Sequence, residues 1–293
     1  MGKLTTARRV FLTLDYIFLI ALGLLCVLPM LHVLAVSLSA SAPASAGDVM
    51  LWPLGFNWRS YEFVANRPEF LRAFLISVQR LALGLPVCML LTITAAYPMS
   101  KERGAFRARD FFAWFCMVTM LFSGGMIPLY IVVRNVGLID SIWALILPGG
   151  VGVFNIILLL NFFRSLPREL EEAAFIDGAG HWSTLFRIFL PLSKPVLATI
   201  TLFIAVGHWN SWFDGMIYMN STDKYPLQTL LQTTVVALDS RIFSERDLDT
   251  LKYVSDRTTR SAEIFIAMVP VLLVYPFLQR YFTTGIVLGS VKG

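Results

Sequence analysis

The most polar stretch within the apolar part of the sequence is residues 207–214, Gly-His-Trp-Asn-Ser-Trp-Phe-Asp. This stretch places aromatic rings beside an amide and a carboxylate. Aromatic faces stack on the C–H faces of sugar rings, and amide and carboxylate groups form hydrogen bonds with the surrounding hydroxyls. We therefore expect Trp209, Asn210 and Asp214 to line a path for a sugar-like solute.

An alternative assigns the same region to a membrane surface. Trp212 and Tyr218 would then belong to an aromatic belt at the outer interface. Asp214 would cap a helix or pair with a cation at that surface. The residue types fit both interpretations.

Three further polar residues lie within apolar segments, where each costs free energy unless it faces protein or water. Asn155 and Gln79 are weaker candidates for the same path. Arg80 follows Gln79 directly, and its long side chain would either face the path or extend outward to the interface.

Other chemistries are excluded by missing motifs. No lysine is followed by serine or threonine, so the phosphate-binding GxxxxGK[ST] loop of many ATPases is absent. No Gly-x-Ser-x-Gly nucleophile motif is present. The histidines have no metal-binding spacing, and no Cys-x-x-Cys occurs, so no metal site is expected. The histidines are His32, His181 and His208, and the cysteines, which we interpret as packing residues, are Cys26, Cys88 and Cys116.

The composition is that of a membrane protein. Of 293 residues, 57% are hydrophobic and only 15% are charged, which excludes an ordinary soluble domain. The formal net charge of +5 is read by location, because basic residues near the inner ends of spans set membrane orientation. It therefore does not indicate a nucleic-acid partner.

Six apolar runs are expected to cross the bilayer as helices, namely residues 10–38, 70–98, 110–133, 142–163, 196–218 and 261–282. The first run is too long for a signal-peptide core and is interpreted as a retained span. The Ala/Ser tract at 39–46 resembles a signal-peptidase site, which is the alternative. Ser123-Gly124-Gly125 with Pro128 should break the third run, either along a translocation path or as a packing kink.

The basic loop 101–109, with four Lys or Arg residues, fixes the orientation. It lies inside, so both termini are expected in the cytoplasm, and segments 47–69, 134–141 and 219–260 connect the spans outside. Segment 219–260 is the weakest part of this topology prediction, because it carries six basic residues beside six acidic ones. The fold class is therefore all-α, a polytopic membrane protein with six transmembrane helices.

The inner connection 164–195 is too structured to be a tether; we call it the hairpin. Ser165 is expected to cap a helix that runs from about Pro167 to Asp177, with glutamates in its first turn. Positive-φ glycines at 178 and 180 should end this helix. Ser183 should start a second helix, which the prolines at 191 and 195 keep short.

Two interpretations of the hairpin require no partner protein. An amphipathic hairpin could lie in the lipid headgroup region, but such helices usually have a basic polar face, and this first helix is acidic. The hairpin could also pack on its own membrane bundle, which does not exclude a partner.

The hairpin resembles the EAA signature of ABC importer permeases. The matching residues extend over most of the hairpin. Glu172-Ala173-Ala174 is followed by Gly178 and then by Ile188-Phe189-Leu190-Pro191, at the spacings of that signature. In that family the hairpin is the coupling helix that fits a cleft of a separate ATPase subunit. The resemblance implies these ATPase-coupling residues: Glu172, Ala173, Ala174, Asp177, Gly178, Leu190 and Pro191.

The order of spans and the C-terminal sequence resemble the carbohydrate branch of these importers, and in particular the smaller permease of maltose-type systems. In those permeases a glycine-containing tail reaches the ATPase interface. The resemblance implies a second cytoplasmic contact by Gly289, Val291, Lys292 and Gly293. Without the resemblance, the tail would be interpreted as a frayed chain end.

The resemblance implies a single permease domain over residues 1–293 in a bacterial inner membrane. Residues 1–69 would hold the first span and outer connection, 70–284 the core with the hairpin, and 285–293 the tail. Implied partners are a second permease, two ATPase subunits that bind ATP and Mg²⁺, and an extracytoplasmic binding protein. This chain would itself hold no cofactor. The solute would be a sugar, and an oligosaccharide such as an alginate fragment is the narrower expectation.

Two other functional classes are alternatives to an importer subunit. An ion-coupled carrier or channel needs intramembrane carboxylates, and only Asp214 and Glu263 lie in or near the core spans. That class also leaves the hairpin without a role. An intramembrane enzyme needs a nucleophile and a base at matching depth, which the sequence does not indicate.

Overall fold

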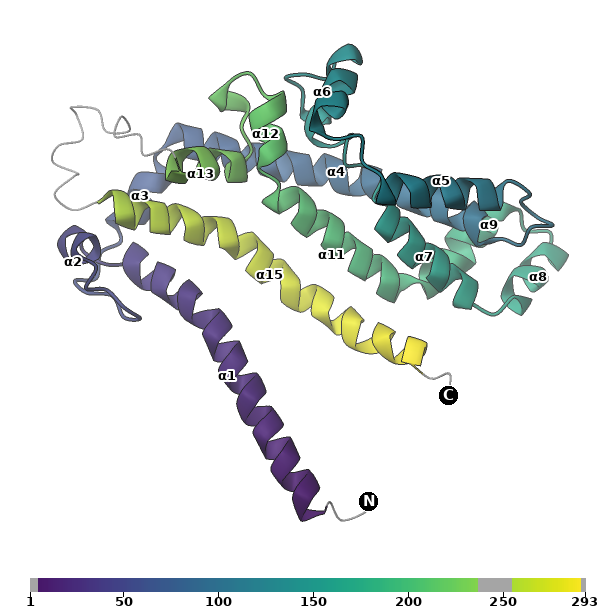
Figure 1. Ribbon diagram of the computed structural model, residues 1–293, viewed down its shortest axis with the longest axis horizontal. Helices are drawn as coiled ribbons and strands as arrows, with labels where there is room; N and C mark the ends of the chain where they lie inside the picture. Colours follow the sequence, from purple (N-terminus) through teal and green to yellow (C-terminus); the bar gives the residue numbers. More distant parts are fainter. Residues whose placement is uncertain (1–4, 237–254, 291–293) are drawn as a thin grey trace. The chain divides into compact units, whose positions relative to one another are not determined.

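The computed structural model describes residues 5–236 and 255–290, and every regular element within these ranges is helical, as predicted (Figure 1). The N-terminal elements are α1 (Thr6–Ser37), α2 (Ser41–Ala46), α3 (Arg59–Ala65), α4 (Pro68–Ser100), α5 (Arg109–Leu121), α6 (Met126–Asn135), η1 (Ile142–Leu145) and α7 (Val153–Ser165). They are followed by α8 (Glu169–Ile176), α9 (His181–Thr184), the π-helical η2 (Leu185–Phe189), α10 (Leu190–Leu192), α11 (Lys194–Asn210), α12 (Phe213–Tyr218), η3 (Thr222–Lys224), α13 (Leu227–Val236) and α15 (Asp256–Ser290).

Among the described residues, three helices are long and apolar enough to cross a membrane: Arg8–Ser37 of α1, α4, and Asp256–Pro276 of α15. Two more pairs meet the same test together but are bent, α5 with α6 by 118° and His181–Leu192 with α11 by 84°. α7 is apolar but shorter than the roughly 20 residues that a span needs. Three to five candidate spans agree with a polytopic membrane protein, and the expected number of six stays a prediction.

The breaks in the helices follow glycine and proline. The predicted break of the third run is confirmed, because α5 ends at Leu121 and α6 starts after Gly125, whose φ is +87°. The fourth run was wrongly predicted as one helix from 142: η1 is followed by Pro148-Gly149-Gly150, and α7 begins only at Val153. Proline and glycine disfavour a continuous helix there.

The fifth run was predicted as one helix over 196–218 and is instead interrupted. α11 ends at Asn210, Ser211 is extended with a ψ of 124°, and α12 resumes at Phe213. The hydroxyl of Thr229 donates to the carbonyl of Trp212 at 2.7 Å, so a distant segment occupies a backbone acceptor that the interruption releases.

The chain divides into two compact units. The first comprises the residues up to Leu71 together with 233–269. Within it, Tyr61 stacks on Trp58 at 4.7 Å between ring centroids and forms a 2.7 Å hydrogen bond with Ser37. Arg67 donates to Glu263 at 2.8 Å, which compensates a carboxylate that is only 5% exposed.

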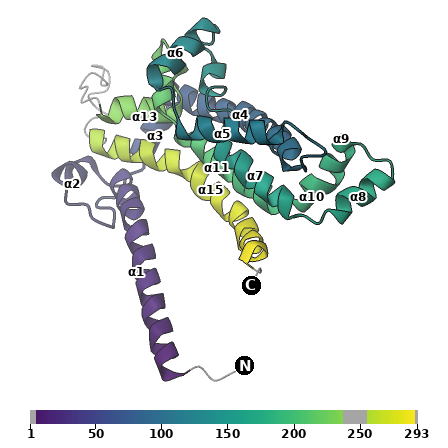
Figure 2. The same ribbon diagram turned by 45° about the vertical axis from the view of Figure 1, so that its right-hand side comes forward.

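The second unit comprises 72–232 and the chain from Pro270. Within it, α7 packs against both α5 and α11 (Figures 1 and 2). Its core joins residues of α4, α7, η2 and α11, and three rings from three of these elements, Tyr97, Phe163 and Phe189, meet edge to face at 5.2–6.2 Å. These rings fix the end of α4 to the base of the hairpin. The expectation of a single permease domain stays a prediction.

Asp140 joins two connections of this second unit. It adopts a left-handed φ of 64°, and its N–H donates to the carbonyl of Tyr218 at 2.8 Å. Its carboxylate accepts from the N–H of Asn220 at 3.1 Å and pairs with Lys224. The hydrogen bond from Lys224 holds the pKa of Asp140 below its ordinary value of 3.8.

We expect Asp140→Asn to lower the melting temperature in detergent at pH 7 by less than Asp140→Ala does, because asparagine tolerates the left-handed conformation and alanine does not. Since the folded-state pKa is lowered, the stabilisation by the charge is complete above pH 3.8 and is lost as the pH falls through the folded-state value. The melting difference between wild type and Asp140→Asn should therefore shrink at pH 3. An equal difference at both pH values would contradict this account.

Candidate functional site

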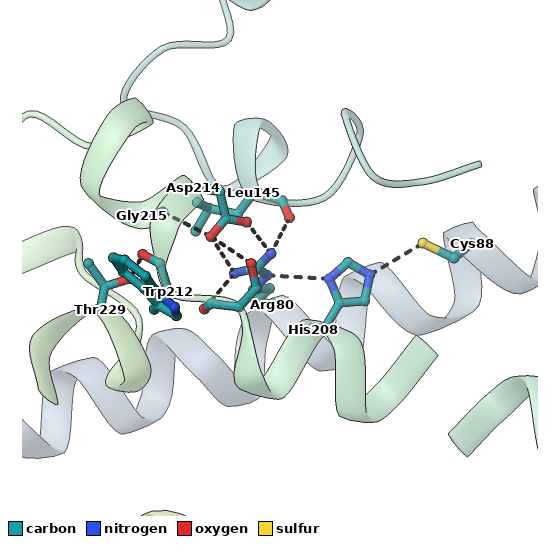
Figure 3. Close-up of polar contacts among 9 residues, drawn as sticks. Arg80, Cys88, Leu145, His208, Trp212, Asp214, Gly215 and Thr229 are labelled. Carbon is teal, nitrogen blue, oxygen red and sulfur yellow. Dashed lines mark hydrogen bonds and ion pairs between the residues drawn. The ribbon is translucent and has the colours of Figure 1, made fainter. Parts of the chain in front are cut away.

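Arg80 of α4 lies at the centre of a buried polar cluster (Figure 3). Its side chain is 3% exposed and forms an ion pair with Asp214, with one nitrogen, Nη1, 3.2 Å from Oδ1. Nη2 also donates to the carbonyl of Leu145 at 2.8 Å, and Nη1 to that of Ser211 at 3.4 Å. The arginine therefore ties α4 to η1, to the break after α11 and to α12. It does not extend outward to the interface, which was one of the two expectations for it.

Asp214 is held in the first turn of α12, where a carboxylate is favoured by the helix dipole. Its Oδ1 accepts from the hydroxyl of Ser211 and from the N–H of Gly215, both at 2.9 Å. A Cβ on Gly215 would overlap the hydroxyl of Thr229 and lie 3.0 Å from Cδ of Pro226, so only glycine lets this turn approach its neighbour. The carboxylate is thus fully engaged by Arg80 and by its own turn.

His208 completes the cluster on the other side of the guanidinium (Figure 3). Nε of Arg80 lies 3.3 Å from Nδ1 of His208, and Sγ of Cys88 lies 3.3 Å from Nε2. Arginine can only donate, so Nδ1 must accept and the imidazole proton is assigned to Nε2 in the neutral ring. A Cβ on Gly84 would lie 2.9 Å from Nε2, which shows how closely the ring packs on α4.

The cluster lines a cavity of about 570 Å³ in the second unit. Of the path residues expected from the sequence, Asp214 and Asn155 line this cavity. Trp209 does not; it is 4% exposed and packs edge to face on Phe74 at 5.8 Å. Asn210 and Gln79 are exposed and are also outside the lining. The polar side chains of the lining are Arg80, Cys88, Thr92, Ser123, Asn155, His208, Ser211, Asp214 and Tyr218.

The cavity can form hydrogen bonds in several directions without an excess of charge. In its described lining, Arg80 and Asp214 compensate each other, and His208 is neutral. The lining combines hydroxyl, amide and imidazole groups with the aromatic side chains of Phe213 and Phe203. This arrangement suits a polyhydroxylated solute better than an isolated ion.

The hairpin forms a helix, a turn and a second helical arm, and α8, α9 and α10 lie together at one end of α7 and α11 (Figure 2). Gly178 has the predicted positive φ, +79°, but Gly180 was wrongly assigned one, because its φ is −79°. Ser165 does not cap α8; its hydroxyl donates to the carbonyl of Phe162 at 2.7 Å and ends α7. The second arm starts at His181, and its π-helical segment precedes Pro191, which lacks the N–H for an α-helical bond.

Most hairpin residues singled out from the sequence are exposed on the described chain. Ala174 is buried and Leu190 is partly buried, whereas the remainder are exposed, namely Glu172, Ala173, Asp177, Gly178 and Pro191. Large apolar side chains accompany them, with exposed fractions of 86% for Ile176, 63% for Trp182 and 55% for Phe186. Of these side chains, Trp182 stacks on Phe186 at 6.1 Å between centroids, and exposed apolar side chains of this size are typical of interaction surfaces.

Lys101, just after the end of α4, is a functional candidate that sequence reasoning missed, because it served only as a topology signal there. Its side chain is 7% exposed, and Nζ lies 2.7 Å from Oε1 of Glu171 in α8. The ammonium also lies 3.9 Å from the ring centroid of Tyr97 and 4.0 Å from that of Phe189. Burial lowers the pKa of Lys101, and the Glu171 carboxylate opposes this shift.

Of the four residues in the expected cytoplasmic tail contact, the structure describes only Gly289. Gly289 lies in the last turn of α15. Val291, Lys292 and Gly293 lie outside the described residues.

Comparisons place this sequence among transport proteins. It matches, over residues 6–288, the family described as binding-protein-dependent transport system inner membrane components. Protein LplC of Bacillus subtilis (strain 168) is 40% identical over 291 residues, which cover 99% of this chain and 97% of LplC. The polygalacturonan/rhamnogalacturonan transport system permease protein YtcP of the same strain is 40% identical over 286 residues, which cover 98% of this chain and 99% of YtcP.

One solved structure is similar in fold and sequence. It is the crystal structure of a bacterial ABC transporter involved in the import of the acidic polysaccharide alginate. The TM-score is 0.88 at 31% identity, over 96% of this chain and 100% of the other.

The buried ion pair allows a double-mutant test. Asp214→Leu leaves the Arg80 guanidinium buried without its counter-charge, and we expect it to destabilise the purified protein by about 3 kcal/mol. Arg80→Met should cost less, because the Asp214 carboxylate is 21% exposed. The double variant should recover part of the loss, measured by thermal unfolding in detergent. Simple additivity of the two single effects would contradict the coupling.

Proposed function

The chain belongs to the family of binding-protein-dependent transport system inner membrane components, and on that basis we propose that it is the membrane-spanning subunit of an ATP-driven sugar importer. It is a transport component rather than an enzyme. In the proposal it forms half of the translocation path, and separate subunits bind ATP and Mg²⁺. The observation that carries the proposal is the exposed hairpin.

The hairpin has the features of a rigid docking element. Its base is fixed by buried rings and by Lys101, whereas its tip exposes Ile176 beside Asp177 and Gly178. A free apolar tip is unfavourable in water and becomes favourable when a cleft covers it. We infer that the ATPase subunit provides this cleft, and that Glu172 and Asp177 bind its polar groups.

The membrane topology follows from the same proposal. We place the hairpin and both chain ends in the cytoplasm of a bacterium and count six crossings of the inner membrane. In this arrangement, α7 together with the broken segment from η1 forms the fourth crossing, and α11 with α12 forms the fifth. The broken segments face the path rather than lipid, because freed backbone groups need protein or water as partners.

The solute is proposed to be an oligosaccharide. The relative YtcP is described as transporting polygalacturonan and rhamnogalacturonan, and the similar solved transporter imports alginate. The cavity offers hydroxyl, amide and aromatic groups suited to sugar rings. A second permease subunit would supply the other half of the path, and an extracytoplasmic binding protein would deliver the solute.

The alternative of an ion-coupled carrier is disfavoured by two contacts. It requires carboxylates that bind the coupling ion at membrane depth. Asp214 is engaged by Arg80, and Glu263 accepts from Arg67 at 2.8 Å. Both carboxylates are therefore already compensated by arginine.

Reconstitution tests the proposed function. The chain, its co-purifying subunits and the binding protein are placed in proteoliposomes containing MgATP. Uptake of oligogalacturonate, alginate oligosaccharide and maltotriose is then compared. We expect ATP-dependent uptake of at least one acidic oligosaccharide. Transport by this chain alone, driven by an ion gradient without ATP, would overturn the proposal.

Two hairpin glycines provide a matched pair of variants. A Cβ at either Gly178 or Gly180 meets no atom within 4 Å, so a clash does not distinguish them, but only Gly178 has a positive φ. We expect Gly178→Val to reduce uptake roughly tenfold or more, because a β-branched residue is strained at a left-handed φ and displaces the tip, while the protein stays in the membrane. Gly180→Val adds the same side chain at an ordinary φ and should stay near wild type. Equal uptake by the two variants would contradict the role of the turn.

A further inference from the structure

Lys101 occupies an unusual position for a lysine. It directly follows α4, yet it is almost fully buried against α8 and η2. Its ammonium has a carboxylate partner, Glu171, at 2.7 Å and two aromatic faces, Tyr97 and Phe189, at about 4 Å. A buried cation is tolerated only with such compensation, so these three groups must keep their positions around it.

The rings beneath Lys101 come from α4, α7 and three segments of the hairpin. Tyr97 of α4 packs edge to face on Phe163 of α7, Phe189 of η2 and His181 of α9. His181 in turn packs on Phe175 of α8 at 5.1 Å. The ammonium thus sits on the ring cluster that joins both arms of the hairpin to α4.

The backbone at the end of α4 is also held by arginines. Arg164 at the end of α7 donates to the carbonyl of Met99, and Arg109 at the start of α5 donates to that of Lys101, both at 2.9 Å. A second ion pair between the same segments, Glu102 with Arg168, is exposed on both sides. Exposed pairs contribute little, so the buried Lys101 contact dominates this connection.

α4 continues from this point to the cavity as one helix. Arg80, Cys88 and Thr92 of α4 all line the cavity. At 1.5 Å per residue, Arg80 lies roughly 30 Å along the helix from Lys101. A displacement at the Lys101 end is therefore delivered to the guanidinium that holds Asp214.

We propose that Lys101 is a positioning residue that transmits movement of the hairpin to α4, and through α4 to the Arg80 cluster in the cavity. This inference rests on the proposed function, because it assumes that ATPase subunits move the hairpin. The ion pair with Glu171 resists separation of α8 from α4, and the two rings resist sliding of η2 past it. The hairpin and α4 then move as one body.

Cys88 provides a reporter in the cavity that needs no knowledge of the solute. In a background with Cys26→Ser and Cys116→Ala it is the remaining cysteine of the chain. The purified complex with its ATPase subunits is trapped with MgATP and vanadate, and the rate of Cys88 modification by a small methanethiosulfonate is measured. We expect trapping to change this rate in the background protein and in Lys101→Arg.

In Lys101→Met, the ATPase subunits should remain bound and trap nucleotide, while the change in Cys88 reactivity falls roughly tenfold. Glu102→Gln removes the exposed ion pair of the same connection and serves as the matched control, with a response like the background. If Lys101→Met does not accumulate in the membrane, Glu171→Gln carries the same test with an almost isosteric side chain.

The outcomes separate the two proposals. A full Cys88 response in both Lys101→Met and Glu171→Gln overturns the transmission role and leaves the proposed function intact. Loss of the ATPase subunits from Lys101→Met also overturns it, because Lys101 would then shape the docking surface. Absence of any ATP-dependent response in the background protein overturns the proposed function itself.

Discussion

A buried guanidinium needs a partner for each of its N–H groups, and this requirement shapes the second unit around Arg80. A charge in a medium of low dielectric is tolerated only when counter-charge and acceptors surround it. Asp214, Leu145, Ser211 and His208 provide them, and they come from two stretches of the chain, η1 and residues 208–214. The interruption after α11 follows from the same need, because an unbroken helix would leave no free carbonyl at Ser211 for the arginine. The polar cavity is thus a product of charge compensation.

The same requirement acts at the other end of α4, with a different result. Lys101 has one carboxylate and two rings instead of a ring of carbonyls, and all three belong to the hairpin base or to α4 itself. Fixing the base in this way lets the tip expose Ile176 and Trp182 without collapse onto the bundle. The exposed tip and the fixed base are therefore separate parts of the hairpin, and the buried charge of Lys101 defines the base.

Local signals in the sequence predicted much of this, and pairings across the chain were missed. The positive φ at Gly178, the break before Gly125 and the acidic first turn of α8 follow from residue type and were confirmed. The predictions for Ser165 and Gly180 were wrong because the surrounding structure overrode local preference. The Ser165 hydroxyl bonds within the last turn of α7, and Gly180 adopts an extended conformation. Arg80 was underestimated because its partner lies 134 residues away, and nothing in a single sequence states which intramembrane charges meet. A lone arginine and a lone aspartate in apolar runs were the available signal.

Helix continuity links the two buried cations. α4 is one helix from Pro68 to Ser100 despite two internal prolines, whereas its neighbours are interrupted, α5 from α6 at Gly125 and α11 from α12 at Ser211. The prolines at 86 and 98 each remove one hydrogen bond from α4, whereas its neighbours stop and restart, so bending is easier at their breaks than within α4. Movement that enters at Lys101 is therefore carried along α4 and absorbed at the breaks, which border the cavity. The positions of the charges and of the breaks together convert one displacement at the hairpin into a change of cavity shape.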